Sequence, residues 1–223
     1  MHGTRASLSL LLASGGELPI TYLVKQSIVT LDMEGVLTPE IWIAVAERTE
    51  IDALRLTTRD EPDYDKLMRH RLKHLNENGI TLSGIQEVIG GLEPLKGAVE
   101  FLDALRERTR VIILSDTFEQ FAAPLVRQLH WPTLFCHSLV VENDRVVDYR
   151  LRMSDQKRHS VIALKSIGFK VIAAGDSYND TTMLAEADHG FLFCAPETVV
   201  SQFPEFPAID DYDNLLAAIL KLA

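Results

Sequence analysis

Three short apolar runs, far apart along the chain, each lead directly into a polar segment. The runs are residues 28–31, 111–114 and 171–174, and the polar segments that follow them are 32–35, 115–117 and 175–180. Runs of this kind, with helical patterns between them, are typical of buried strands in a parallel sheet. Ligands of an open parallel sheet bind outside the carboxyl ends of its strands. The sequence therefore predicts an α/β protein with a Rossmann-like parallel sheet core, whose active site gathers the three polar segments.

The stretch between the first two predicted strands is too long for a simple crossover. The first strand is expected at 27–32, and from 39 to 91 apolar residues recur at helical spacing without a strand pattern. We therefore expect a helical cap domain at 39–91, inserted into a catalytic core formed by 25–38 and 92–223.

The rest of the predicted core alternates helices and strands. We expect helices at 97–108, 119–129, 160–167, 181–186 and 212–222, and strands at 110–114, 170–174 and 190–193. Two further strands, 139–142 and 146–151, should form a hairpin that turns through Asn143 and Asp144.

The composition limits the partners and the compartment. The net charge is −10, from 22 basic and 32 acidic residues, which argues against a surface that binds nucleic acid or a membrane. Phosphorylated small molecules remain compatible, since a divalent cation and a few basic groups can reverse the field in one pocket. The two cysteines, Cys136 and Cys194, form neither a disulfide framework nor a CxxC pair, so we expect a cytoplasmic protein.

We expect the first residues to lie outside this fold. No apolar run approaches the roughly 20 residues of a membrane span, and the apolar stretch at 8–13 is shorter than the core of a usual signal peptide. We expect residues 1–24 to be a disordered leader that the fold can lose.

Asp32 and Glu34 stand two residues apart on an extended segment that leaves the first strand. Side chains alternate along a strand, so both carboxylates project the same way. One can act as a nucleophile or metal ligand while the other exchanges protons, provided that their surroundings separate their pKa values. Gly35 then lets the backbone turn closely around a ligand. Taken alone, the motif also fits a strand-end turn with solvated acids.

Ser115, Asp116 and Thr117 are candidates for binding a phosphate. They follow the second strand and precede the helix expected at 119–129. Thr117 with Gln120 three residues later also spells a capping box. The two interpretations are compatible, because a helix N-terminus with free N–H groups is itself an anion site.

Lys157 lies in the charged segment 154–158, which we interpret as a loop. A lone lysine in such a loop is usually solvated. As a compact point charge it would suit a phosphate, whereas the neighbouring Arg158 carries its charge in a planar fork.

The strongest single motif is 175–180. Asp176 and Asp180 straddle a strand-to-helix turn, with Asn179 between them as a neutral donor. Mg²⁺ is commonly held by one or two carboxylates, with water and substrate phosphate at its other positions. The alternative is a capping box of Ser177 with Asp180.

Other familiar sites lack support. His70 and His74 stand four apart on a predicted helix, but the glutamate of the HExxH zinc motif is missing and cations flank the imidazoles. The sequence has no GxGxxG, no Walker A lysine and no GxSxG elbow, which argues against dinucleotide binding, P-loop chemistry and serine hydrolysis.

Taken together and in this order, the four motifs resemble the haloacid dehalogenase superfamily of aspartyl-phosphate phosphotransferases. The order is D-x-[acid]-G at a strand end, a serine at the next, a lysine, and then G-D-S-x-x-D. The likeness spans about residues 27–213. Within it, the segments 39–43, 57–60 and 176–184 look like the phosphoserine phosphatase/homoserine phosphotransferase bifunctional family.

This resemblance implies a role for each core residue. Asp32 would be the nucleophile, and Glu34 would act as general acid and then general base. Mg²⁺ would be held by Asp32, Asp176 and the backbone carbonyl of Glu34, with Asp180 steadying the site nearby. Most phosphoserine phosphatases have Asp where this chain has Glu34, and the bifunctional subgroup shares the Glu.

The remaining roles concern the substrate. Ser115 and Lys157 would bind the transferring phosphoryl group with help from Asn179. In the cap, Glu40 would contact the substrate ammonium and Arg71 the substrate carboxylate.

The activity implied is Mg²⁺-dependent hydrolysis of L-phosphoserine through an aspartyl phosphate. The family also allows the phosphoryl group to pass to L-homoserine, and the sequence leaves open which acceptor is preferred. A homodimer is expected from the family alone. The competing hypotheses are a phosphatase of another small phosphomonoester on the same fold and a non-catalytic regulatory protein.

Overall fold

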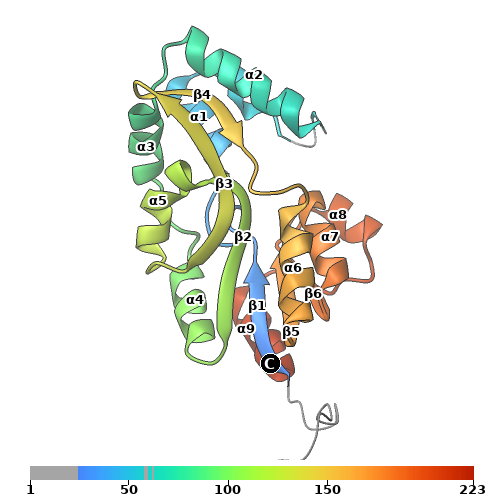
Figure 1. Cartoon of the computed structure of the whole chain (residues 1–223). Helices are drawn as coiled ribbons and strands as arrows, with labels where there is room; N and C mark the ends of the chain where they lie inside the picture. The colour runs from blue at the N-terminus through green and yellow to red at the C-terminus, as the bar shows by residue number, and fades with distance from the viewer. Residues whose placement is uncertain (1–24, 58–59, 62) are drawn as a thin grey trace, which may run out of the picture.

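The computed structural model describes residues 25–57, 60–61 and 63–223. Its centre is a sheet in the order β4-β3-β2-β1-β5-β6-β7 (Figure 1). Neighbouring strands run parallel except for the antiparallel pair β3–β4. The α/β class and the mostly parallel sheet are therefore confirmed, whereas the predicted leader at 1–24 lies outside the described residues. The strands are β1 (Gln26–Leu31), β2 (Arg110–Phe118), β3 (Thr133–Glu142), β4 (Arg145–Arg150), β5 (Phe169–Gly175), β6 (His189–Phe193) and β7 (Ala208–Ile209).

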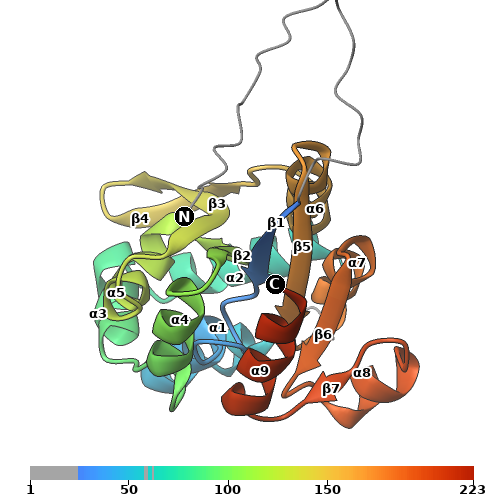
Figure 2. The same ribbon diagram turned by 90° about the horizontal axis from the view of Figure 1, so that it is seen from below.

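Helices cover both faces of the sheet because the central strands are apolar on both sides. On β5, Ile172 and Ala174 join the cluster that includes α4, α5 and α9, while Val171 and Ala173 join the cluster that includes α6, α7 and α8. All four side chains are fully buried. Alternation with period two therefore divides one continuous apolar run between two layers, and Figure 2 shows α9 and α7 on opposite sides of the strands. The helices are α4 (Ala98–Arg106), α5 (Glu119–Gln128), α6 (Gln156–Ser166), α7 (Thr181–Glu186), α8 (Glu197–Gln202) and α9 (Tyr212–Leu222).

The segment 39–91, called the insert below, lies beyond the carboxyl end of β1 (Figure 1). Its described residues hold α1 (Ile41–Thr49), the 3-10 turn η2 (Asp52–Arg55), α2 (Tyr64–Glu77) and α3 (Leu82–Gly90), and no strand. The helical content expected for this segment is therefore present.

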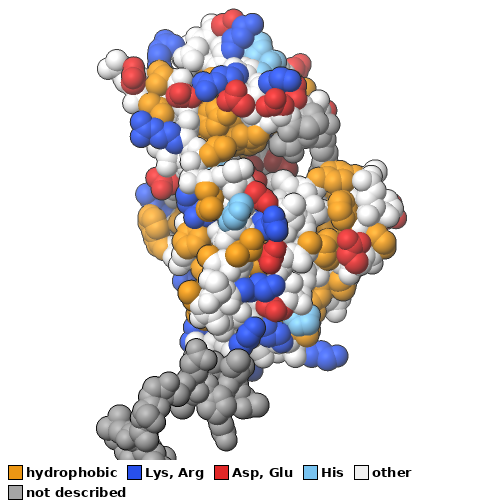
Figure 3. All heavy atoms as spheres, turned by 45° about the vertical axis from the view of Figure 1, so that its right-hand side comes forward, with side chains coloured by type: hydrophobic (Ala, Val, Ile, Leu, Met, Phe, Trp, Pro, Cys, Tyr) orange, Lys and Arg blue, Asp and Glu red, His pale blue; other side chains and the backbone are white. Residues whose placement is uncertain are grey.

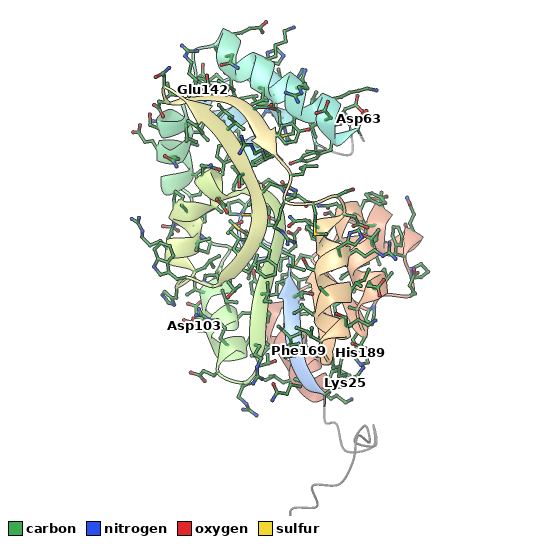
Figure 4. All side chains as sticks on the ribbon, viewed as in Figure 1. Lys25, Asp63, Asp103, Glu142, Phe169 and His189 are labelled. Atoms are coloured by element: carbon green, nitrogen blue, oxygen red, sulfur yellow. The ribbon has the colours of Figure 1, made fainter. Side chains whose placement is uncertain are left out.

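The β3–β4 hairpin is hydrogen-bonded to the start of α3 in the insert. It turns through Asn143 and Asp144, whose φ angles of 48° and 63° are left-handed as a tight hairpin turn requires. The Asp144 carbonyl accepts from the N–H of Leu82 at 2.7 Å, and its carboxylate accepts from the N–H of Ser83 at 3.0 Å. Glu142, at the end of β3, accordingly lies beside the insert in Figure 4.

Two predicted boundaries are wrong in ways that matter for the site. Strand β2 continues to Phe118, so residues 115–117 lie in a strand with irregular pairing and not at a helix start. The predicted capping box of Thr117 with Gln120 is absent, because Phe118 is the N-cap of α5 and makes no side-chain cap. The Gln120 amide instead bonds both backbone groups of Leu139, at 2.9 and 3.2 Å.

The second correction concerns α6, which begins at Gln156 and not near residue 160. Lys157 is therefore in the first turn of a helix and is buried, whereas the sequence suggested a solvated loop. Helix α8 and strand β7 were not predicted, while α7 and α9 have the expected bounds. Within the described residues, no helix combines the length and the apolar character that a membrane crossing needs.

Candidate active site

A cavity of about 340 Å³ opens between the carboxyl end of the sheet and the insert. Acidic side chains lie in the hollow below the insert in Figure 3. Every residue predicted for the site lines this cavity except Asp180, which is buried beneath it. The residues from outside the insert form the core wall, and those from 39–91 form the insert wall. The predicted lining residues are Asp32, Glu34, Ser115, Asp116, Thr117, Lys157, Asp176 and Asn179 on the core wall, and Glu40 and Arg71 on the insert wall.

Three carboxylates and one lysine form the base of the core wall. Asp32 follows β1, Asp176 follows β5 and Asp180 ends the 3-10 turn η3 (Tyr178–Asp180); one oxygen from each lies within 4.8 Å of the others. The first turn of α6 places the Lys157 Nζ 2.9 Å from Asp32 Oδ1 and 2.7 Å from Asp180 Oδ1. We call Asp32, Asp176 and Asp180 the acid trio.

Asp180 also closes the turn after β5. Its Oδ2 accepts from the N–H groups of Asp176 and Ser177, each at 3.0 Å, and the expected capping box with Ser177 is present. The capping box and a contact with Lys157 therefore coexist, because the two carboxylate oxygens of Asp180 serve different partners.

Two glycines make room for these carboxylates. A Cβ on Gly35 would lie 2.4 Å from the Asp176 carboxyl, and a Cβ on Gly175 would lie 2.4 Å from the Asp180 side chain. Gly35 also has a φ of +80°, which other residues adopt only with strain. The glycines in both predicted motifs are therefore required by close approach to the acid trio.

The acid trio suits a divalent cation. Burial, then the carboxylates of Asp180 and Asp176, raise the pKa of Asp32 despite Lys157, and burial with Asp180 raises the pKa of Asp176 to about 7. Burial disfavours the charge of Lys157 as well, yet Asp180 and Asp32 hold its pKa well above its usual value. One lysine thus leaves the trio with excess negative charge, and an all-oxygen donor set is what Mg²⁺ prefers. The residues present fit Mg²⁺.

Glu34 has a different environment from Asp32. Its Oε2 accepts from the Ile41 N–H at the start of α1, at 2.9 Å. Burial, followed by the nearby Glu40, raises the pKa of Glu34 to about 7, while the Ile41 N–H, Thr117 and Arg71 oppose the rise. A carboxyl with such a pKa can both give and take a proton near neutral pH.

The segment 115–117 offers less to a phosphate than expected. Ser115 is buried and its Oγ accepts from the N–H of Thr117 at 3.3 Å. The Asp116 carboxylate accepts from the side-chain amides of Asn179 at 3.1 Å and Gln156 at 3.2 Å. An ionised carboxylate has no proton to donate, so Asp116 has only its backbone N–H to offer a phosphate oxygen.

The insert wall brings a cation and an anion to the same cavity. Arg71 is buried on α2, where its guanidinium carbon lies 4.5 Å from the centre of a Trp42 ring and its Nη2 donates to the Leu56 carbonyl at 2.7 Å. Its Nε has no hydrogen-bond partner among the described residues, and burial lowers the pKa of Arg71 to about 10. Glu40 is exposed at the N-cap of α1 and makes no side-chain cap.

The His70–His74 pair has a structural explanation. His70 Nε2 lies 2.9 Å from the Ala53 carbonyl, and His74 Nδ1 lies 3.7 Å from a Glu77 oxygen. Among the described residues, the grouping with metal-ligand geometry is the acid trio.

Comparison with known proteins agrees with this geometry. The family model of the haloacid dehalogenase-like hydrolases matches residues 26–188. The chain belongs to this family. It is similar to phosphoserine phosphatase ThrH of Pseudomonas aeruginosa, 62% identical over 195 residues that cover 87% of this chain and 95% of the relative. It is also similar to a phosphoserine phosphatase of Pseudomonas syringae pv. tomato, 56% identical over 218 residues that cover 97% of this chain and 90% of the relative.

Solved structures show the same fold at much lower identity. A phospho-aspartyl intermediate analogue of phosphoserine phosphatase superposes with a TM-score of 0.72 at 17% identity, covering 87% of this chain and 99% of the other. A substrate-bound phosphoserine phosphatase complex superposes with a TM-score of 0.65 at 18% identity, covering 89% and 99%. The resemblance drawn from the four motifs is thus confirmed at the level of the family.

Several residues of this haloacid dehalogenase-like hydrolase escaped the sequence argument. Tyr64 lines the cavity and donates its hydroxyl to the Asp116 carbonyl at 3.2 Å, so it ties α2 to the core. Trp42 supports Arg71. Gln156 donates to the Asp116 carboxylate at 3.2 Å, and His137 Nε2 lies 3.5 Å from it. Nothing in the local sequence marks these residues, since each acts through a neighbour that is distant in the chain.

Proposed function

We propose that this protein is a Mg²⁺-dependent phosphatase of L-phosphoserine that works through an aspartyl phosphate on Asp32. The observation that carries the proposal is the composition of one cavity. Its core wall has the acid trio and Lys157, which suit a phosphoryl group and a metal, and its insert wall has Glu40 and Arg71, which suit the ammonium and carboxylate of an amino acid. Two similar proteins named phosphoserine phosphatase support the same substrate.

In the first step, a carboxylate oxygen of Asp32 attacks phosphorus and the bond from phosphorus to the serine oxygen breaks. Glu34 gives its proton to that departing oxygen, so L-serine leaves neutral at its hydroxyl. In the second step, Glu34 takes a proton from water, the water oxygen attacks phosphorus and the Asp32–phosphorus bond breaks. Inorganic phosphate leaves and Asp32 is restored.

Charge stabilisation accounts for most of what phosphoryl transfer needs from a protein. We assign Lys157, Ser115 and Asn179, which line the cavity, as the donors to the phosphoryl oxygens. We assign Mg²⁺ to Asp32, Asp176 and the backbone carbonyl of Glu34, steadied by Asp180; when bound, it supplies positive charge to the carboxylates and the phosphoryl group.

We propose that the insert, 39–91, is a cap domain over a core of 25–38 and 92–223. The amino acid would lie under the insert wall, with its carboxylate on Arg71 and its ammonium on Glu40. The hydroxyl of L-homoserine would meet the same Glu34 base as water does, which makes homoserine an alternative acceptor. We also expect a cytoplasmic protein, since both cysteines are free thiols. A homodimer is expected from the family resemblance, and light scattering of the purified protein tests it.

The test is incubation of the purified protein with L-phosphoserine and Mg²⁺, with and without L-homoserine, followed by ³¹P NMR of the products. We expect inorganic phosphate in both cases and none with excess chelator. Phosphohomoserine that forms only when homoserine is present would establish the transferase. If the protein hydrolysed another phosphomonoester but not phosphoserine, the substrate assignment would be refuted and the aspartyl-phosphate mechanism would stand.

A further inference from the structure

A carboxylate stands where the proposed function needs positive charge. Asp116 lines the cavity, and its Oδ2 lies 4.0 Å from the Nζ of Lys157. An unpartnered carboxylate there would repel a phosphate. Three side chains besides Lys157 surround this carboxylate: Oδ1 lies 3.5 Å from His137 Nε2 and accepts from Gln156 Nε2 at 3.2 Å, and Oδ2 accepts from Asn179 Nδ2 at 3.1 Å.

The ring of His137 is fixed in one orientation and one tautomer. His137 is 3% exposed on β3, directly opposite Phe118 of β2, and its ring centre lies 6.4 Å from that of Tyr64. Its Nδ1 accepts the backbone N–H of Arg152 at 3.1 Å. Since Nδ1 is an acceptor, the ring proton is on Nε2, the nitrogen that faces Asp116.

Asp116 in turn fixes the amide of Asn179. Because Asn179 Nδ2 donates to Asp116, its Oδ1 is turned to the other side, where it accepts from the Ser177 hydroxyl. The second N–H of Nδ2 then remains for a ligand in the cavity. With the amide reversed, Asn179 would present an oxygen to the Asp116 carboxylate and lose the donor that a phosphate needs.

We propose that His137 is a positioning residue for phosphoryl transfer. It holds Asp116, and through Asp116 it keeps the donors of Asn179 and Lys157 in place for the phosphoryl group. This inference rests on the phosphatase proposed above.

Two amide substitutions separate this role from ordinary packing. In His137→Asn the amide can replace Nδ1 and accept the Arg152 N–H, but it is too short to reach Asp116. In His137→Gln the longer amide can replace Nε2 and still donate to Asp116. We expect kcat/KM for phosphoserine to fall about 10- to 100-fold in His137→Asn and to stay within about threefold of the wild type in His137→Gln.

The matched control is His130→Asn, which removes an exposed His–Asp contact of 2.9 Å, to Asp103, far from the cavity. It should leave kcat/KM unchanged. In a double-mutant cycle, His137→Asn should cost almost nothing further once Asp116→Asn is present, since residues of one network are not additive. Equal kcat/KM in His137→Asn and the wild type, or multiplicative losses in the cycle, would overturn the inference.

A second readout does not depend on turnover. In ¹⁵N NMR of the histidine rings, His137 of the wild type should show the tautomer with its proton on Nε2, and its Nε2 signal should move in Asp116→Asn. A proton on Nδ1, or no response to that substitution, would overturn the inference even if phosphoserine proved not to be the substrate. If the wild type failed to turn over phosphoserine but His137 carried its proton on Nε2 and responded to Asp116→Asn, only the proposed substrate would be refuted.

Discussion

The core wall and the insert wall of the cavity hold their charged groups in different ways. On the core wall, Lys157 is already ion-paired with Asp32 and Asp180, and Asp180 is already bonded to the turn that carries it. On the insert wall, Glu40 makes no capping bond and the Nε of Arg71 has no partner in the described part of the chain. The charged groups of the core wall are thus held by one another, whereas the insert wall keeps hydrogen-bonding capacity for a ligand.

This contrast suggests a division of labour between the walls. Pre-organised charges act on the phosphoryl group, which is the same in every phosphomonoester. Groups with unused donors or acceptors distinguish one substrate from another. A ligand that cannot form hydrogen bonds with them binds less tightly, because these groups then lose water without gaining a partner. The predictions below separate the two walls.

The largest effect is expected from Asp32→Asn on the core wall. An amide cannot form the aspartyl phosphate, so turnover of phosphoserine should fall by at least about 10³-fold. Phosphate release by the purified variant measures this, with thermal unfolding as the check that it folds. Activity within tenfold of the wild type would exclude Asp32 as the nucleophile.

Lys157→Met should destabilise the metal-free protein strongly. It leaves the buried acid trio without its cation, and removing one partner from a buried ionic group costs about 3–5 kcal/mol. Urea unfolding in chelator should show the loss, and Mg²⁺ should recover part of it. Lys165→Met on the same helix removes a partly exposed ion pair with Glu186 and a hydrogen bond to the Glu186 carbonyl, and should cost about 1–2 kcal/mol. Equal costs for the two variants would contradict this account.

Arg71→Met tests the insert wall. We expect KM for phosphoserine to rise about 10- to 100-fold with a smaller change in kcat, since hydrogen bonds to charged groups contribute about 1.5–3 kcal/mol. Turnover of phosphoethanolamine, which lacks the carboxylate, should change little. The control is Arg69→Met. Arg69 lies on the same helix as Arg71, and the substitution removes its exposed 2.8 Å ion pair with Asp148. Equal losses on both substrates would assign Arg71 to the fold and not to specificity.

A pH dependence of stability is also expected in the metal-free protein. The pKa of Asp176 and that of Glu34 are raised to about 7 in the folded state, so the folded state holds protons that the unfolded chain has lost. Stability should therefore fall as pH rises from about 4 to about 7. Urea unfolding across this range should show a shallower slope with Mg²⁺ present and in Asp176→Asn. A slope of the opposite sign, unchanged in Asp176→Asn, would contradict the burial of uncompensated acids.

The sequence predicts the corner between β5 and α7 best, because everything that builds it is local. The apolar strand, the glycine, the capping serine and the two acids of 175–180 lie within a few residues of one another, and the structure has the strand, the turn and the capping box in the expected places. The strand end at Asp32 was readable for the same reason.

The sequence fails where distant contacts decide the local structure. Gln120 could not cap α5 because the backbone of Leu139, on the hairpin, takes its amide. The sequence suggests a solvated Lys157 because its buried partners, Asp32 and Asp180, are distant in the chain. Asp155 is the N-cap of α6 but makes no side-chain cap. Arg71 and Glu40 line the same cavity as the core residues. Their candidate roles came from the family resemblance, since no spacing rule relates the insert to the sheet.

The most direct test of the central claim is a search for the phosphoenzyme. Wild-type protein is mixed with ³²P-labelled phosphoserine and Mg²⁺, quenched in acid within milliseconds to seconds, digested and mapped. We predict label on the peptide that contains Asp32, lost on a chase with unlabelled substrate and absent in Asp32→Asn. Rapid turnover without label on Asp32, or label on another residue, would contradict the account.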